Sequence, residues 1–125
     1  MFVRQAGKVE PKVMEMAGAS GVSMRLLVGR DDGAPNFAMR WFELEPGGHT
    51  PQHKHNYEHE VIIVDGLGEV NGEGQVSTLA SGDAVYIPAN ETHQFRNTGT
   101  QVLKFVCMVP TTHDCGSVRA PTPGS

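Results

Sequence analysis

Short apolar runs separated by turn residues dominate the chain from Val22 onward. The clearest runs cover residues 22–28, 37–44, 60–64, 76–79, 84–87, 93–97 and 102–109. Between them stand turn signals such as Asp65-Gly66 and Asn71-Gly72, dipeptides that are typical of tight β-hairpins. No interval between these breakers holds a helix of ordinary length. The pattern therefore predicts an all-β chain of about eight short strands in a small antiparallel barrel or sandwich.

The two ends of the chain differ from this middle part. Residues 1–21 have mixed polarity and predict an N-terminal arm with one short strand near residues 9–13. Residues 22–110 carry the strand pattern and fit a single barrel domain, as expected for a chain of 125 residues. Residues 111–125 are rich in Thr, Pro and Gly, so we expect a flexible C-terminal tail, in which His113 takes no part in a site.

Composition and charge limit the partners. The formal net charge is −4 and the basic residues are scattered singly, which argues against a nucleic-acid partner. No apolar run approaches the roughly 18 residues of a membrane span, and the N-terminus lacks an apolar signal segment, so a cytoplasmic protein without a membrane partner is expected. Cys107 and Cys115 fit neither a disulfide scaffold nor a CxxC motif, so reduced thiols are expected.

Five of the six histidines lie between positions 49 and 93. Within this stretch His53, His55 and His59 share one strand parity, so an extended backbone projects all three to the same face. A single buried histidine is usually a hydrogen-bonded core residue. Three on one face need charged partners or a metal ion to satisfy their nitrogen lone pairs, and the cluster therefore points to metal chemistry.

Two long motifs give the chain a resemblance to the cupin family. Gly47, five residues, His53-Lys54-His55, three residues, His59, six residues and Gly66 resemble the family's G(X)5HXH(X)3-4E(X)6G, with His59 in the place of glutamate. The second motif, G(X)5PXG(X)2H(X)3N, is matched from Gly82 to Asn97 through Pro88 and His93, with Asn90 in the place of glycine. The resemblance covers roughly residues 22–110.

The resemblance implies a single-domain jelly-roll β-barrel, the double-stranded β-helix, that holds one divalent metal ion. Its ligands would be His53, His55, His59 and His93. This set is similar to the four-histidine subgroup of small cupins, in which manganese is the associated metal. Imidazole ligands alone leave Fe²⁺, Ni²⁺, Cu²⁺ and Zn²⁺ open as alternatives to Mn²⁺. Glu60 competes for the third motif position, but its parity places it opposite the histidines.

Several other residues are candidates to line the pocket. Phe105 and Cys107 alternate with solvent-facing positions on the last apolar run and are expected to face the interior, where Cys107 is either part of the pocket or a small core residue. Tyr57 shares the ligand parity and either contributes a phenol or packs. Arg40 is either an inward anion anchor or a solvent-facing edge residue, because the residues around it are apolar on both faces. His49 is a candidate to support the site or an exposed loop residue.

A divalent ion held by four neutral imidazoles keeps its full charge and, if octahedral, two open positions. The expected function is a Mn- or Fe-dependent oxidoreductase, similar to a dioxygenase, that acts on a small oxygenated organic molecule; its catalytic residues are not identified. Two alternatives stay open: a non-catalytic module in which the metal anchors a small molecule, and an isomerase of a sugar or keto acid. A homodimer is expected because residues 61–64 are apolar on both faces and exposed strand surface needs covering.

Overall fold

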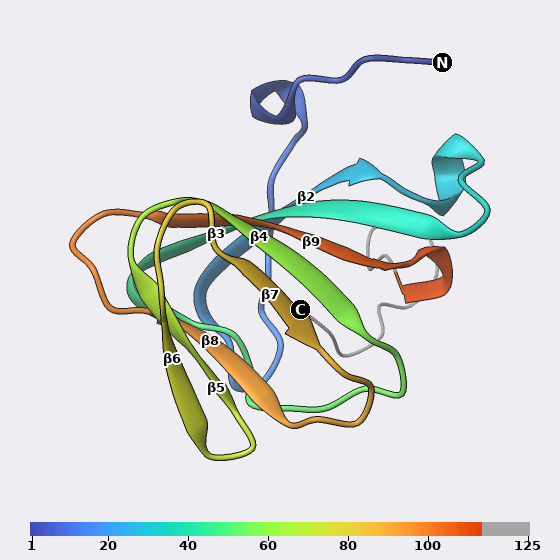
Figure 1. The fold of residues 1–125 in the computed structure, drawn as a ribbon. Helices are drawn as coiled ribbons and strands as arrows, with labels where there is room; N and C mark the ends of the chain where they lie inside the picture. Colours follow the sequence, from blue (N-terminus) through green and yellow to red (C-terminus); the bar gives the residue numbers. More distant parts are fainter. Residues whose placement is uncertain (114–125) are drawn as a thin grey trace.

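Nine strands form one curled antiparallel sheet (Figure 1). The computed structural model describes residues 1–113. The strands are β1 (Lys12–Val13), β2 (Ser20–Val28), β3 (Phe37–His49), β4 (His59–Asp65), β5 (Gly68–Gly72), β6 (Gln75–Leu79), β7 (Ala84–Ile87), β8 (His93–Asn97) and β9 (Leu103–Pro110). Their order is β6-β5-β8-β3-β9-β4-β7, with β2 also paired to β3 and β1 to β2.

The helical segments within residues 1–113 are three short 3-10 turns: η1 (Ala6–Lys8), η2 (Arg30–Asp32) and η3 (Thr111–His113). None of them is long and apolar enough to cross a membrane. The expected all-β class is confirmed. Cys115 and the other residues of 114–125 lie outside the described part of the chain.

Alternation of buried and more exposed positions along β4 and β9 gives this part of the sheet an inner and an outer face. In β4, Val61 and Ile63 are buried together with His59, whereas Glu60 and Ile62 are exposed. The same alternation runs through β9. Because successive strand side chains point to opposite faces, this register carries the histidine parity directly into the barrel interior.

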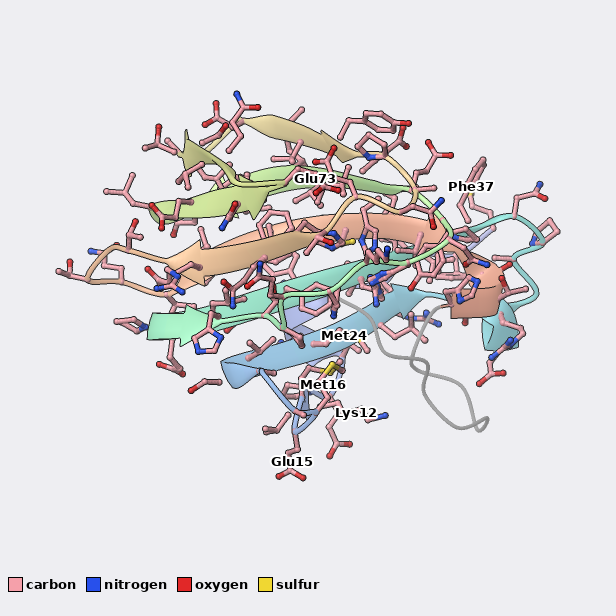
Figure 2. The ribbon with its side chains drawn as sticks, turned by 90° about the horizontal axis from the view of Figure 1, so that it is seen from below. Lys12, Glu15, Met16, Met24, Phe37 and Glu73 are labelled. Carbon is pink, nitrogen blue, oxygen red and sulfur yellow. The ribbon has the colours of Figure 1, made fainter. Side chains whose placement is uncertain are left out.

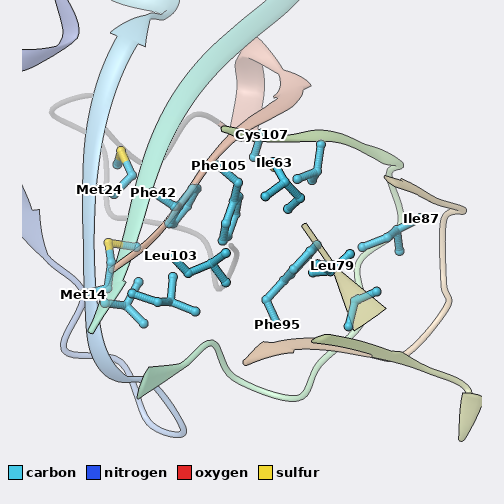
Figure 3. Packing of buried hydrophobic residues seen from close by; sticks show 14 of the residues in the cluster. Met14, Met24, Phe42, Ile63, Leu79, Ile87, Phe95, Leu103, Phe105 and Cys107 are labelled. Carbon is cyan, nitrogen blue, oxygen red and sulfur yellow. The ribbon is translucent and has the colours of Figure 1, made fainter. Parts of the chain in front are cut away.

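Stacked phenylalanines fill the centre of the barrel (Figure 3). The ring of Phe105 stacks on Phe42 at a centroid distance of 5.3 Å and on Phe95 at 4.8 Å. All three side chains are at most 1% exposed. Such offset aromatic contacts stabilise a core beyond the burial of apolar area alone.

The segment Pro46-Gly47-Gly48, whose composition predicts a turn, instead lies inside β3. Gly47 has a φ of +78°, and the pairing of β3 with β2 shifts register here, so the segment is an irregularity within a continuous strand. A Cβ on Gly48 would lie 2.8 Å from the carbonyl oxygens of both Glu45 and Ser20, which only glycine avoids. The bent strand delivers His49 to the edge of β8, directly before the histidine segment.

The N-terminal arm packs along β2. The expected short strand is present as β1, and Met14, which follows it, is 7% exposed and joins the core. Figure 2 shows Lys12, Glu15 and Met16 on the β2 side of the sheet. The arm thus extends the sheet beside β2 and adds Met14 to the core.

The chain stays packed after β9. In η3, Thr111 is buried, its backbone N–H donates to the carbonyl of Asn36 at 3.2 Å, and its hydroxyl donates to the carbonyl of Pro35 at 3.3 Å. Ordered structure therefore continues three residues beyond the boundary at residue 110 that the sequence predicts.

Candidate metal centre

Backbone hydrogen bonds join the two motif segments. The N–H of His53 donates to the carbonyl of His93 at 3.1 Å, and the N–H of His93 donates back to the carbonyl of His53 at 2.9 Å. The N–H of Asn90 donates to the carbonyl of His55 at 2.6 Å. Asn90 adopts a φ of +68°, a left-handed conformation that asparagine tolerates better than most residues. It can therefore stand where the motif has glycine.

Three imidazoles converge inside the barrel. One ring nitrogen from each of His53, His55 and His93 lies within 4.8 Å of the others, which makes these residues a group that could hold a metal ion. The ring centroids of His53 and His55 are 4.3 Å apart, and His93 lies 5.2 Å from each. Two of the side chains come from the segment before β4 and one from the start of β8, so the fold itself assembles the group.

The protonation pattern of this group suits a metal ion. The Nδ1–H of His93 donates to the carbonyl of Glu91 at 2.9 Å, which leaves a lone pair on Nε2. The buried Nε2 atoms of His55 and His93 have no hydrogen-bond partner among the residues that the structure describes. Metal-binding histidines characteristically donate their second ring N–H to a carbonyl or carboxylate, and buried polar atoms rarely stay unsatisfied. The residues therefore fit a divalent ion.

Burial and neighbouring charges keep the imidazoles neutral. Burial, reinforced by His93 and Arg40, lowers the pKa of His53 to about 4. Burial, with His53 and His93 as its main charged neighbours, also lowers the pKa of His55 to about 4. The pKa of His93 is lowered by burial, and its hydrogen bond to Glu91 offsets part of that effect. Neutral imidazoles at ordinary pH are the form that binds metal.

His59 lies beside this group rather than within it. It is fully buried, and its ring centroid is 4.6 Å from that of His55. Its Nε2 is 3.4 Å from the Nδ1 of His55, and its Nδ1 is 3.2 Å from the Sγ of Cys107. Burial, and next the charge of Arg40, lowers the pKa of His59 to about 2. That His59 is the fourth metal ligand therefore stays a prediction.

Arg40 and Cys107 lie opposite each other on β3 and β9. Both side chains point inward and are at most 1% exposed, so the open question about Arg40 resolves to the inward position. Its Nη2 donates to the Sγ of Cys107 at 3.3 Å. Phe105, by contrast, makes its ring contacts with the phenylalanines of the core, and its role in lining the pocket stays a prediction.

Tyr57 and His113 form an aromatic wall beside the histidines. The ring of Tyr57 lies 4.7 Å from His55 and 5.4 Å from His59, and His113 stacks on Tyr57 at 3.9 Å. Burial, together with the charges of Arg40 and Arg30, lowers the pKa of His113. The Thr/Pro-rich surroundings of His113 give no signal of this contact. His113, expected in a tail away from the site, instead lies beside the histidine group. That it takes no part in the site stays a prediction.

Two other residues that the sequence singles out lie outside the cluster. Glu60 is exposed on the outer face of β4, as its parity predicts, and so is not placed to replace His59. His49 ends β3, where its Nδ1 lies 3.4 Å from the Nε2 of Gln94 and 3.4 Å from the carbonyl oxygen of Thr50. Neither residue belongs to the converging group within residues 1–113.

Comparisons with known proteins agree with this geometry. The chain matches the cupin domain over residues 40–109. It is 40% identical over 91 residues to the 1-methylthio-D-xylulose 5-phosphate methylsulfurylase of Rhodospirillum rubrum, which covers 66% of this chain and 58% of that protein. It is 29% identical over 114 residues to an oxalate-binding protein of Thermotoga maritima, which covers 87% of this chain and 93% of that protein.

Among solved structures, the polyketide cyclase RemF from Streptomyces resistomycificus superposes with a TM-score of 0.83 at 29% identity, covering 89% of this chain and 80% of that one. The expected jelly-roll barrel is confirmed, and the chain belongs to the cupin family. It spans less than two thirds of the length of the methylsulfurylase.

Proposed function

We propose that this chain is a metal-dependent cupin enzyme that binds a small oxygenated organic molecule at one divalent ion and transforms it. The observation that carries the proposal is the group of His53, His55 and His93, whose ring nitrogens converge and in which the buried Nε2 atoms of His55 and His93 have no hydrogen-bond partner among the described residues. His59 is proposed as the fourth ligand. Manganese or iron is the proposed metal, on the resemblance to four-histidine cupins.

The charges around the site favour a ligand that carries negative oxygen atoms. The histidines are neutral, so a divalent ion there would keep its full charge. The charge of Arg40 is felt at His53, His55 and His59, whose pKa values it helps to lower. The name of one relative contains a sugar phosphate, and the name of another contains the dicarboxylate oxalate. These features support an organic anion as the substrate class.

The chain's own residues would hold and shield this ligand. A bound divalent ion would supply Lewis acidity toward the ligand's oxygen atoms. Tyr57 and His113 close one side of the histidine group with stacked rings. The packed phenylalanine core would limit the entry of water into the barrel interior. We propose oxidation by dioxygen as the first reaction to test.

The test is oxygen consumption by protein loaded with Mn²⁺ or Fe²⁺ in the presence of small hydroxy, keto and dicarboxylic acids. The proposal expects uptake that requires both an added acid and the metal. It also expects the His53→Ala variant to lose this uptake and His49→Ala, a histidine outside the group, to keep it. Metal-loaded protein that transforms none of these acids, in the presence or absence of oxygen, would contradict an enzymatic role.

A second candidate function is a non-catalytic binding module in which the metal anchors an organic anion. The similarity to the oxalate-binding protein, which extends over 93% of that protein, favours it. Calorimetry with oxalate separates the two functions. Metal-dependent binding without chemical change supports the module, whereas turnover of any bound acid supports the enzyme.

Replacing His59 with glutamate tests its proposed role as a ligand. The variant His59→Glu restores the usual cupin ligand set, and its carboxylate can bind a divalent ion, so we expect metal binding to be retained with a changed metal preference. Elemental analysis of wild type and variant after growth in the same medium measures this. Complete loss of metal from the variant would show that position 59 does not face the metal as a ligand must.

The outer face of the sheet supports the proposal of a homodimer. Ile62 and Tyr86 are 42% and 60% exposed there, beside a groove of about 460 Å³ lined by residues of β3, β4, β7 and β9. Apolar strand surface of this kind is commonly covered by another chain. Light scattering coupled to size exclusion should give twice the chain mass for wild type and a lower mass for Ile62→Lys. A strict monomer contradicts the proposal.

A further inference from the structure

A chain of buried hydrogen bonds leads from Arg40 to the histidine group. Arg40 and His59 are 0% exposed and Cys107 is 1% exposed. The guanidinium donates to the Sγ of Cys107 at 3.3 Å, the sulfur lies 3.2 Å from the Nδ1 of His59, and the Nε2 of His59 lies 3.4 Å from the Nδ1 of His55. Four side chains from three strands and one loop are therefore linked in series.

The direction of these hydrogen bonds decides whether the site can bind a metal. A neutral imidazole carries one N–H and one lone pair. If the hydrogen of His59 is on Nε2, this N–H donates to the Nδ1 of His55. The hydrogen of His55 must then be on its own Nε2, where it points into the histidine group and blocks that nitrogen as a ligand. If it is on Nδ1, His59 donates to the sulfur, and its Nε2 lone pair accepts the Nδ1–H of His55. Only this second arrangement leaves the Nε2 lone pair of His55 available to a metal ion.

Sulfur can serve as the acceptor at the end of this series. Arginine has only donors, so Arg40 cannot accept a hydrogen bond and instead places a positive charge beside the sulfur. This positive charge favours partial negative charge on the sulfur, which is the form that accepts the Nδ1–H of His59. In many metal sites a carboxylate or carbonyl occupies this position behind a ligating histidine and fixes its tautomer. Glu91 supplies such a carbonyl to His93.

We propose that Cys107, held by Arg40, is a positioning residue of the metal centre. Its sulfur accepts the Nδ1–H of His59 and thereby fixes the tautomers that metal binding requires. In these tautomers the Nε2 lone pair of His55 is available to the metal. The Nε2 lone pair of His59 accepts the Nδ1–H of His55 in the metal-free protein and can bind the metal once that hydrogen bond opens. This inference rests on the proposed metal site, but it assigns Cys107 a role that requires no reaction at its thiol. It also explains why a charged side chain is buried beside a small thiol in the wall of an apolar barrel.

The test compares wild type with Cys107→Val, which removes the acceptor at similar volume, and Cys107→Ser, whose hydroxyl can still accept. Leu103→Val is the matched control, because it alters a buried residue of the same strand outside the series. Titration calorimetry with Mn²⁺ alone measures affinity. Long-range ¹⁵N–¹H correlation spectra of the metal-free proteins report the tautomer of each neutral histidine directly.

We expect Cys107→Val to bind Mn²⁺ about 10–100-fold more weakly, as is typical when the partner behind a ligand is lost, and Cys107→Ser to recover most of that loss. The spectra should show the Nδ1–H tautomer of His59 in wild type, Cys107→Ser and Leu103→Val, and a mixture in Cys107→Val. A purely structural role would lower stability without changing the tautomer.

Two results would overturn the inference in distinguishable ways. Wild-type Mn²⁺ binding that is unchanged in Cys107→Val, or a wild-type His59 with its hydrogen on Nε2, refutes the positioning role and leaves the metal site standing. A wild-type protein that binds no Mn²⁺ refutes the proposed function, and the positioning role fails with it.

Discussion

The His93→Ala variant is expected to bind Mn²⁺ more than about 100-fold more weakly than wild type. Loss of a partner behind a ligand already costs roughly 10–100-fold in metal affinity, and loss of a ligand itself should cost more. His93 combines the features of a committed ligand: it is 1% exposed, its Nδ1–H is held by the carbonyl of Glu91, and its Nε2 lacks a partner among the described residues.

Calorimetric titration of the metal-free proteins with Mn²⁺ measures this loss. The His49→Ala variant is the matched control, because it removes a histidine of the same region that lies outside the converging group. Thermal unfolding of both variants checks that they fold. Equal Mn²⁺ affinity in wild type and a folded His93→Ala protein would remove His93 from the ligand set.

The metal-free protein should lose stability steeply as the pH falls below about 6.5. The pKa of His55 is lowered to about 4 and that of His59 to about 2, chiefly by burial, so both stay neutral in the folded state while the unfolded chain takes up protons. Stability is therefore fully present above the unfolded pKa near 6.5 and is lost as the pH falls toward the folded values.

The expected slope is about 1.4 kcal/mol of unfolding free energy per pH unit for each buried histidine that remains neutral. Urea denaturation of chelator-treated protein between pH 7.5 and pH 4.5 measures it. In the His59→Gln variant the unfolding free energy should change with pH less steeply, by about 1.4 kcal/mol per pH unit, because one histidine no longer contributes. Equal slopes in the two proteins would mean that His59 does not stay neutral inside the fold.

The strands and the inward face were largely predictable because both follow from local patterns. Alternation placed His59, Val61 and Ile63 inside and Glu60 outside, and the burial of β4 confirms this. The histidines of the two motifs are also brought together, as far as His53, His55 and His93 are concerned. Parity and motif spacing act over short distances along the chain, which is why sequence alone captures them.

Other features depend on contacts between distant segments and carry no local signal. The facing of Arg40 is not predictable from the sequence, because the residues around it, Met39, Trp41 and Phe42, are apolar on both faces of the strand. Its inward position follows from the pairing of β3 with β9. His113 reaches Tyr57 only because η3 folds back after β9. The carbonyl of Glu91 fixes the tautomer of His93, and a backbone group leaves no trace in the sequence.

The position of Phe105 shows a different limit. Parity correctly predicts that it faces inward, but parity cannot tell how deep along the barrel a side chain lies. Its stacking with Phe42 and Phe95 places it in the core, whereas Cys107, two residues further along the same strand, contacts His59. Depth follows from the strand register across the sheet, which only the structure supplies.

The central claim is that the fold assembles His53, His55 and His93 around one divalent metal ion. The most direct measurement is anomalous diffraction at the manganese absorption edge from crystals of protein loaded with Mn²⁺. We expect a single strong peak inside the barrel, within bonding distance of ring nitrogens of all three histidines. No peak there, or a peak at surface carboxylates alone, would contradict it.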